Sequence, residues 1–273
     1  MTEWLRPESV AEAVELRAEH GDGAHVLAGG TFLGVLLNQG FVEPERLLSL
    51  SRVDELRELS STPERLRLGA MVTHRRVERD PATEGWPALR RAFGLVASQR
   101  VRNQATVGGV LADADYASDP PAMLAALGAT VELRSPRRAR EVSVEELILD
   151  HYETCIAADE LLVGVTVPAQ PERAAYRKFR SRSSEDRPCV AVAATRAEGA
   201  LRVVVGGVAS RPQHFPDACE LAAGADLDEP LARRIGELYA ERIDPISDGR
   251  GSGAYRRRVI AVEVRRAILE LAG

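Results

Sequence analysis

Apolar residues in the first third of the chain alternate between helical spacing and short strand-like runs. Val10, Ala13 and Val14 recur at the spacing of one helix face, which predicts a helix over 7–19 that stops at Gly21. The segments that follow read strand, Gly-Gly turn, helix and strand, an order typical of an α/β unit. They are a strand over 25–28, a helix over 32–39 with Thr31 as its N-cap, and a strand over 47–50.

The middle of the chain mixes short strands with amphipathic helices. A helix with one apolar face is predicted over 86–96. Asp119 and Pro120 have the sequence of a helix start, with the acid as N-cap, and predict a helix over 122–127. Further elements are expected as a strand over 66–68, a helix from Thr73 to Pro81, a hairpin of 130–133 with 141–143, a capping box at 143–146 and a strand over 161–167.

The composition changes at 169–172, where Ala-Gln-Pro-Glu is typical of a linker. Beyond it, alternating apolar residues predict strands over 190–195 and 201–208, and helical spacing predicts helices over 229–241 and 254–271. Strands followed by helices indicate an α+β arrangement. We therefore expect two domains, 1–168 and 172–273, the first divided into subdomains of about 1–55 and 56–168.

Composition and charge exclude several classes of function. The 273 residues are enough for more than one domain, and 45% apolar with 28% charged residues is ordinary for a globular protein. The formal net charge is −5 and no basic face stands out, so we expect no nucleic-acid partner. No apolar run approaches the ~18 residues of a membrane span, and the N-terminus has no apolar signal core. We therefore expect a cytoplasmic protein without a membrane partner.

The cysteines and histidines form no metal-ligand pattern. Cys155, Cys189 and Cys219 lie far apart, which excludes a local CxxC pair and a disulfide framework. Scattered thiols are typical of a reducing compartment. The five histidines form no HxH or HxxxH pattern, so we expect no metal site.

Lysine occurs once in this chain. Of the 36 basic residues, 35 are arginine, and the exception is Lys178. The arginine bias is typical of a GC-rich coding background, and in that background one lysine can arise by chance at a solvated strand end. Alternatively, this position needs a compact point charge in place of a guanidinium fork.

Two Gly-Gly pairs are the main candidates for chemistry. They lie in the segments 27–31 and 105–109, each after apolar residues and before a helix or open loop. Glycine has no Cβ and tolerates positive φ, so paired glycines let backbone N–H groups approach a ligand closely. Such donors suit phosphate, and two loops can hold a diphosphate from both sides, although most Gly-Gly pairs are plain turns. Neither pair forms GxGxxG or GxxxxGK[ST], and no GxSxG occurs, which excludes the Rossmann, P-loop and α/β-hydrolase motifs.

The order of motifs along nearly the whole chain resembles the FAD-binding medium subunit of the molybdenum hydroxylases. That family includes the carbon monoxide dehydrogenase medium subunit and the flavin domain of xanthine dehydrogenase. The segments that carry the resemblance are 28–31, 69–74, 100–109, 112–119, 159–162, 176–178 and 206–209, with Asp248, Tyr255 and Arg256 near the end.

The resemblance implies the fold, the cofactor and the partners. The fold would be a two-subdomain PCMH-type FAD-binding domain, followed by a C-terminal α+β domain of antiparallel strands plus helices. FAD would collect electrons from iron–sulfur clusters and pass them to an external acceptor such as NAD, oxygen or a quinone. Molybdenum and iron–sulfur ligands are absent from this sequence, so a molybdopterin-binding large subunit and a [2Fe–2S] small subunit would be the partners. The alternatives are a stand-alone flavoenzyme, possible as a homo-oligomer, and a scaffold that has lost FAD.

The resemblance also implies residue roles. Lys178 would lie near the isoalloxazine ring, where a cation stabilises negative charge on reduced flavin. Asp119 would contact FAD, with the helix N-cap as its alternative or additional role. No residue is assigned as catalytic, and Tyr116 is the further candidate near the flavin. The FAD-binding residues would be Leu27, Ala28, Gly29, Gly30, Thr31, Phe32, Leu33, Val101, Ala105, Thr106, Gly108, Gly109, Asp113, Ser118, Asp119, Leu162 and Lys178.

The second Gly-Gly segment departs from the family pattern at three positions. Val110 replaces the usual Asn and cannot supply its side-chain hydrogen bond. Asp113 stands where a small residue or His is common, and a carboxylate repels a diphosphate unless it is solvated or turned away. Tyr116 stands where Pro is common, and is expected to stack near the flavin or shield it.

Overall fold

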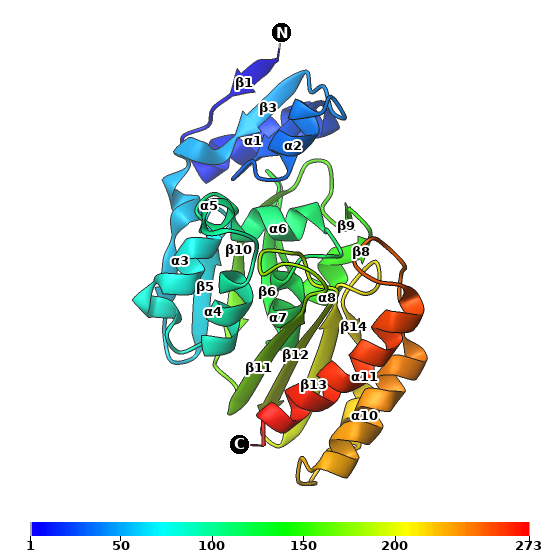
Figure 1. The fold of residues 1–273 in the computed structure, drawn as a ribbon. Helices are drawn as coiled ribbons and strands as arrows, with labels where there is room; N and C mark the ends of the chain where they lie inside the picture. Colours follow the sequence, from blue (N-terminus) through cyan, green and yellow to red (C-terminus); the bar gives the residue numbers. More distant parts are fainter. Residues whose placement is uncertain (1, 273) are drawn as a thin grey trace.

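Three main β-sheets follow one another along the chain in the computed structural model, which describes residues 2–272. The first is a small sheet at one end of the molecule, and the second is an antiparallel sheet in the middle. The third carries two long helices at the opposite end (Figure 1). This order confirms an α+β fold that begins with an α/β unit.

The N-terminal unit contains the two predicted strands joined through a helix, and these strands are parallel. Its elements are β1 (Glu3–Leu5), α1 (Val10–His20), β2 (Ala24–Leu27), α2 (Leu33–Asn38) and β3 (Arg46–Ser49). The strand order is β1-β3-β2, and β3 is parallel to both neighbours. Phe32 occupies the N-cap position of α2, and no side chain caps this helix. The prediction that Thr31 is the N-cap is therefore wrong.

The central sheet has five antiparallel strands. Their order is β4 (Leu59–Ser61), β5 (Arg65–Gly69), β10 (Leu161–Pro168), β6 (Thr130–Arg134) and β7 (Ala139–Ser143). The strands β6 and β7 form the predicted hairpin. A separate two-stranded ribbon consists of β8 (Ile148–Asp150) and β9 (Glu153–Thr154). Because β10 is buried almost along its whole length, it organises the core of this unit.

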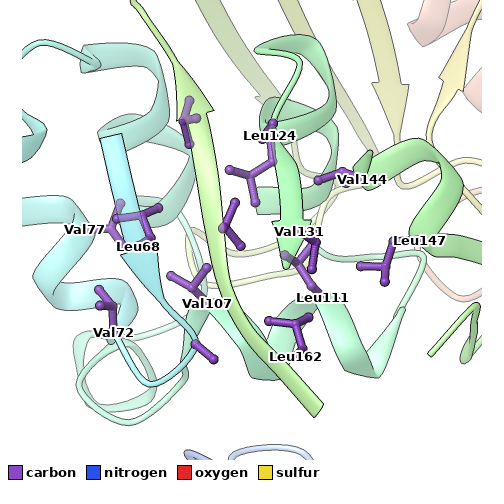
Figure 2. Close-up of a cluster of buried hydrophobic side chains, with 14 of the residues drawn as sticks. Leu68, Val72, Val77, Val107, Leu111, Leu124, Val131, Val144, Leu147 and Leu162 are labelled. Atoms are coloured by element: carbon purple, nitrogen blue, oxygen red, sulfur yellow. The ribbon is translucent and has the colours of Figure 1, made fainter. Parts of the chain in front are cut away.

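Short helices cover the central sheet. They are α3 (His74–Arg79), α4 (Pro87–Gly94), α5 (Gln99–Arg102), α6 (Val107–Asp113), α7 (Pro120–Ala126) and α8 (Val144–Leu147). Ser143 and Glu146 form the predicted capping box. Figure 2 shows buried leucines and valines around β10, among them Val107 and Leu111 of α6. This packing holds the second Gly-Gly pair, within α6, against the sheet.

The C-terminal unit is a four-stranded antiparallel sheet with helices. Its elements are β11 (Arg173–Phe179), β12 (Val190–Ala197), β13 (Ala200–Gly206), β14 (Gln213–His214), α9 (Pro216–Glu220), α10 (Glu229–Arg242) and α11 (Gly253–Glu270). The helices α10 and α11 pack together, and α11 covers β11 and β12 (Figure 1). The helix α7 of the preceding unit packs on β12 and β13, which joins the two units.

The remaining regular structure is short. It consists of 3-10 turns at Gly21–Gly23, Leu50–Arg52, Asp54–Arg57 and Pro81–Thr83. Within residues 2–272, no helix is both long and apolar enough to cross a lipid bilayer. The 18-residue helix α11 instead carries charged residues along its length.

Candidate cofactor site

A cavity of about 620 Å³ lies between the N-terminal unit, α6 and the end of β11. Its walls contain every residue that the resemblance assigns to the cofactor, and Val110 and Asp115 in addition. Tyr116 is not among the wall residues. The assigned residues brought together here are Leu27, Ala28, Gly29, Gly30, Thr31, Phe32, Leu33, Val101, Ala105, Thr106, Gly108, Gly109, Asp113, Ser118, Asp119, Leu162 and Lys178.

The first Gly-Gly pair forms a turn that leaves backbone donors free. Gly30 has φ +68°, a left-handed conformation that side chains disfavour. A Cβ on Gly29 would lie 1.9 Å from the carbonyl oxygen of Gln104, so this glycine is required where the two loops touch. In the part of the chain that the structure describes, the N–H groups of Gly30, Thr31 and Phe32 donate to no protein acceptor. These donors lie on the wall of the cavity and suit an anionic group.

The second Gly-Gly pair is used for packing. The N–H of Gly108 donates to the carbonyl of Ala70 at 2.8 Å, and the N–H of Gly109 donates to Thr106 Oγ1 at 3.1 Å. A Cβ on Gly108 would lie 2.7 Å from the Cβ of Ala70, so glycine lets α6 approach the segment after β5. The two glycine N–H groups of the second loop are therefore occupied, whereas the N–H of Thr106 donates to no protein acceptor within residues 2–272. That both loops aim N–H groups at a ligand stays a prediction. The second loop contributes small residues that shape the wall.

Lys178 belongs to a buried hydrogen-bonded group at the end of the cavity. Its Nζ lies 2.8 Å from Asp119 Oδ2 and donates to the carbonyl of Leu95 at 2.9 Å. The hydroxyl of Tyr176 donates to Asp119 Oδ1 at 2.7 Å. The Lys178 side chain is 0% exposed, so its interpretation as a solvated strand-end lysine is wrong.

The ion pair changes the roles expected for both residues. Burial raises the pKa of Asp119 and lowers that of Lys178, while their mutual attraction opposes both shifts. Asp119 occupies the predicted N-cap position of α7, but its side chain makes no capping hydrogen bond within residues 2–272, because it is directed to Lys178 and Tyr176. A ligand beside Lys178 therefore meets a lysine whose charge is compensated by a carboxylate.

Asp113 differs from the other acids around the cavity. Asp22, Asp115 and Glu160 each pair with an arginine. No such pair is found for Asp113 within residues 2–272, and burial together with the charge of Asp115 raises its pKa to about 7. The carboxyl that would repel a diphosphate is therefore largely protonated below neutral pH.

The side chain of Tyr116 is bonded to the C-terminal unit and is not part of the cavity wall within residues 2–272, so its expected place stacked near the flavin or shielding it stays a prediction. Its hydroxyl donates to Asp248 Oδ2 at 2.9 Å, and the guanidinium of Arg250 lies 5.3 Å from its ring centroid. The ring of His151 meets it edge-on, with centroids 4.8 Å apart. Tyr116 therefore contacts the C-terminal unit.

Several cavity residues had no assigned role in the sequence. Arg17, His74, Ile156 and Arg187 all line the wall. His74 is almost fully buried, and burial lowers its pKa to about 4, so it is neutral. A buried apolar pattern around Thr73-His74 could have indicated this position, whereas nothing in the sequence links Arg187 to Asp115. Within residues 2–272, no cluster of His, Cys, Asp and Glu has the composition to hold a metal ion.

Comparisons with known families and proteins cover almost the whole chain. Residues 1–170 match the family described as "FAD binding domain in molybdopterin dehydrogenase". Residues 174–271 match the "CO dehydrogenase flavoprotein C-terminal domain".

Individual relatives agree with the family matches. The nicotine 6-hydroxylase medium subunit of Paenarthrobacter nicotinovorans is 32% identical over 98% of this chain and 96% of its own length. The carbon monoxide dehydrogenase medium chain of Afipia carboxidovorans is 30% identical over 97% of this chain and 95% of its own length. A chain of the quinoline 2-oxidoreductase of Pseudomonas putida 86 superposes with a TM-score of 0.93 at 33% identity, covering 100% of this chain and 97% of that one.

These matches extend over both units and include the segments that form the cavity. A free-donor turn and a largely apolar wall fit the diphosphate and the rings of FAD. The comparisons support a medium subunit over a stand-alone flavoenzyme or a scaffold without cofactor. The chain belongs to the FAD-binding medium subunits of the molybdenum hydroxylases, an oxidoreductase family whose cofactor in this subunit is FAD.

Proposed function

We propose that FAD occupies the cavity between the two Gly-Gly loops and relays electrons there from iron–sulfur clusters to an external acceptor. The observation that carries this proposal is that residues from three separate parts of the chain line one cavity. When bound, FAD supplies reversible redox chemistry that side chains cannot provide. The contribution of this chain is to bind, orient and shield the cofactor.

Three parts of the wall have distinct roles in this proposal. The free N–H groups of 30–32 hold the diphosphate, because they are donors on a turn that only glycine adopts easily. Val101 and Leu162 supply apolar contacts. Lys178, fixed by Asp119, donates a hydrogen bond or orients the ring, but its paired charge cannot act as an isolated cation.

The remaining redox groups would come from partner chains. Cys155, Cys189 and Cys219 are separate free thiols, which cannot hold an iron–sulfur cluster. We therefore propose a molybdopterin-binding large subunit and a [2Fe–2S] small subunit as partners, in the cytoplasm. The relatives are named for nicotine, carbon monoxide and glyceraldehyde, although their medium chains align along nearly their whole length. The oxidised substrate would accordingly be selected by the large partner.

The domain division follows from the same account. We propose a FAD-binding domain over 1–168, with subdomains of about 1–55 and 56–168, and a C-terminal domain over 172–273. The break after β10 and before β11 supports this division.

Purification of the tagged chain from its own cells tests the function. We expect a yellow preparation with stoichiometric FAD, and copurifying subunits that contain molybdenum and iron by elemental analysis. A colourless chain would support the scaffold alternative. A catalytically complete flavoprotein without molybdenum and iron would support the stand-alone enzyme.

A further inference from the structure

The wall segment, residues 113–119, has little regular structure of its own. It connects α6 to α7, and Asp113, Asp115, Ser118 and Asp119 lie on the cavity wall. Its local hydrogen bonds are few: the N–H of Ala117 donates to the Asp115 side chain, and the N–H of Ser118 donates to the Asp115 carbonyl. Its shape must therefore depend on contacts with other parts of the molecule.

The C-terminal unit supplies the ionic contacts, while His151 and Tyr152 of the turn between β8 and β9 also touch this segment. Asp115 pairs with Arg187, in the loop after β11. Asp119 pairs with Lys178 of β11. Both of these acids also line the cavity, so their substitution would alter the wall itself. Tyr116 is different, because it contacts the C-terminal unit without lining the cavity.

The hydroxyl of Tyr116 makes hydrogen bonds with two charged side chains. Its hydroxyl donates to Asp248, and Arg250 Nη2 donates to the same hydroxyl at 2.5 Å. Burial and the hydrogen bond to Asp248 raise the pKa of Tyr116, so its hydroxyl stays protonated and able to donate. A hydrogen bond to a charged acceptor is worth more than one between neutral groups.

The acceptor is itself fixed in place. Arg256 Nη2 donates to Asp248 Oδ1 at 2.5 Å, and Arg256 Nη1 donates to the carbonyl of Gly207 at 2.5 Å. Arg256 is 0% exposed and lies in the long helix α11. Burial acts to raise the pKa of Asp248, but hydrogen bonds from Arg250 and Tyr116 outweigh it and hold this pKa well below its usual range. Asp248 is therefore a charged, rigid anchor.

We propose that Tyr116 is a positioning residue that couples FAD binding to the C-terminal unit. By its bond to Asp248 it holds the wall segment in the shape that FAD requires, so FAD affinity depends on a residue that is not part of the cavity wall. This inference rests on the proposed FAD site. Coupling of this kind is reciprocal, so bound FAD also stabilises the Tyr116–Asp248 contact. Proline at this position could not make the contact, since it has no hydroxyl.

The test compares Tyr116→Phe with Tyr239→Phe in the full chain, purified with any subunits that copurify. Tyr239→Phe is the matched control, because it also removes a buried hydroxyl, one that donates to the carbonyl of Val203 within the C-terminal core. We expect Tyr116→Phe to raise the FAD dissociation constant about tenfold, as for one hydrogen bond to a charged group. Tyr239→Phe should change it by less than about twofold, whatever its effect on unfolding.

A second pair of variants separates positioning from general damage. Asp248→Asn weakens the acceptor, and the double variant with Tyr116→Phe should bind FAD about as well as the weaker single variant. The visible circular dichroism of bound FAD should also change in Tyr116→Phe and not in Tyr239→Phe. Equal FAD affinity in the wild type and Tyr116→Phe, equal losses in the two tyrosine variants, or fully additive effects would each overturn the coupling while leaving the FAD site intact. A wild-type chain that binds no FAD would overturn the proposed function and this inference together.

Discussion

Single residues set the electrostatics of the cavity, and Asp113 is the one whose charge changes near neutral pH. Its pKa is raised to about 7 by burial first and by the charge of Asp115 second, while Arg187 acts in the opposite direction. The other acids on the wall have basic partners: Asp22, Asp115 and Glu160 pair with arginines, and Asp119 pairs with Lys178. The cavity therefore gains one negative charge as the pH rises through 7.

This gives a pH dependence for FAD binding. We expect the FAD dissociation constant to rise about tenfold between about pH 6 and pH 8.5, because the ionised Asp113 repels a diphosphate at short range. In Asp113→Asn, the FAD dissociation constant should depend on pH much less than in the wild type. The measurement is a fluorescence titration with FAD across that range. Asp22→Asn is the control, since Asp22 lies on the wall but its side chain is 87% exposed and paired with Arg17. A wild-type dissociation constant independent of pH would contradict the account.

The same pKa shift has a consequence for the apoprotein. The folded pKa of Asp113 lies above the ordinary value of 3.8, so protons favour the folded state. The contribution of this group to stability is present below about pH 4 and is lost as the pH rises to about 7. Urea unfolding of the apoprotein should therefore show that the free energy of unfolding falls less between about pH 4 and about pH 7 in Asp113→Asn than in the wild type.

The Lys178–Asp119 pair shows how far a residue's neighbours determine its role. Replacement of Lys178 alone leaves a buried carboxylate with only Tyr176 as its hydrogen-bond donor. We expect Lys178→Met to lower the free energy of unfolding by about 3–5 kcal/mol, and the double variant with Asp119→Asn to lower it by less. Denaturant titration of the apoproteins measures both. An unfolding midpoint of Lys178→Met equal to that of the wild type would show that the pair is not formed.

At the scale of elements, the two Gly-Gly loops look alike in sequence but differ in use. In the first loop the N–H groups of Gly30, Thr31 and Phe32 are free, whereas in the second loop the N–H groups of Gly108 and Gly109 donate to Ala70 and Thr106. The reason is that the second pair begins a helix packed tightly on the central sheet, where a Cβ on Gly108 would clash with Ala70. Identical dipeptides therefore mark two walls of the same cavity, although the N–H groups of the two glycine pairs are used differently.

The two glycines of the first loop are required for different reasons, which predicts unequal losses of stability when each is replaced. Gly30→Ala places a side chain at positive φ with its nearest neighbour, Leu27 Cδ1, at 3.3 Å, so we expect a loss of about 1 kcal/mol in stability and a clear loss of FAD affinity. Gly29→Ala would place its Cβ 1.9 Å from the Gln104 carbonyl oxygen, so the loops must separate. Thermal unfolding of both apoproteins should show Gly29→Ala as much the less stable. The reverse order would contradict the packing described here.

Elements with regular apolar spacing were predictable, and those defined by tertiary contacts were not. The hairpin of β6 and β7, the strand β10 and the helices α10 and α11 follow from local pattern. The strand β11 does not, because Arg173, Arg177 and Lys178 break its alternation. The side chains of Arg177 and Lys178 find partners far away in the sequence, Glu263 and Asp119. A distant partner also explains why Asp119, at the N-cap position, makes no capping hydrogen bond within residues 2–272: its side chain pairs with Lys178.

At the scale of the whole molecule, the cavity lies where the N-terminal unit, the central sheet with its helices and the C-terminal unit meet. The N-terminal loop, the wall segment and β11 come from different parts of the chain. The resemblance to a family assigned their residues to one cofactor, and the structure places them on one cavity wall. Local patterns alone could not do so, because no spacing rule links Gly30 to Lys178. Neither the local patterns nor the resemblance predicted the contacts of the wall segment with Arg187 and Asp248, because these side chains meet only in the folded chain.

The most direct test of the central claim is a diffraction structure of the purified protein with FAD. We expect the diphosphate within hydrogen-bond distance of the N–H groups of Gly30, Thr31 and Phe32, and the flavin ring beside Lys178. FAD bound elsewhere, or a diphosphate held by the second loop with the first loop unoccupied, would contradict it.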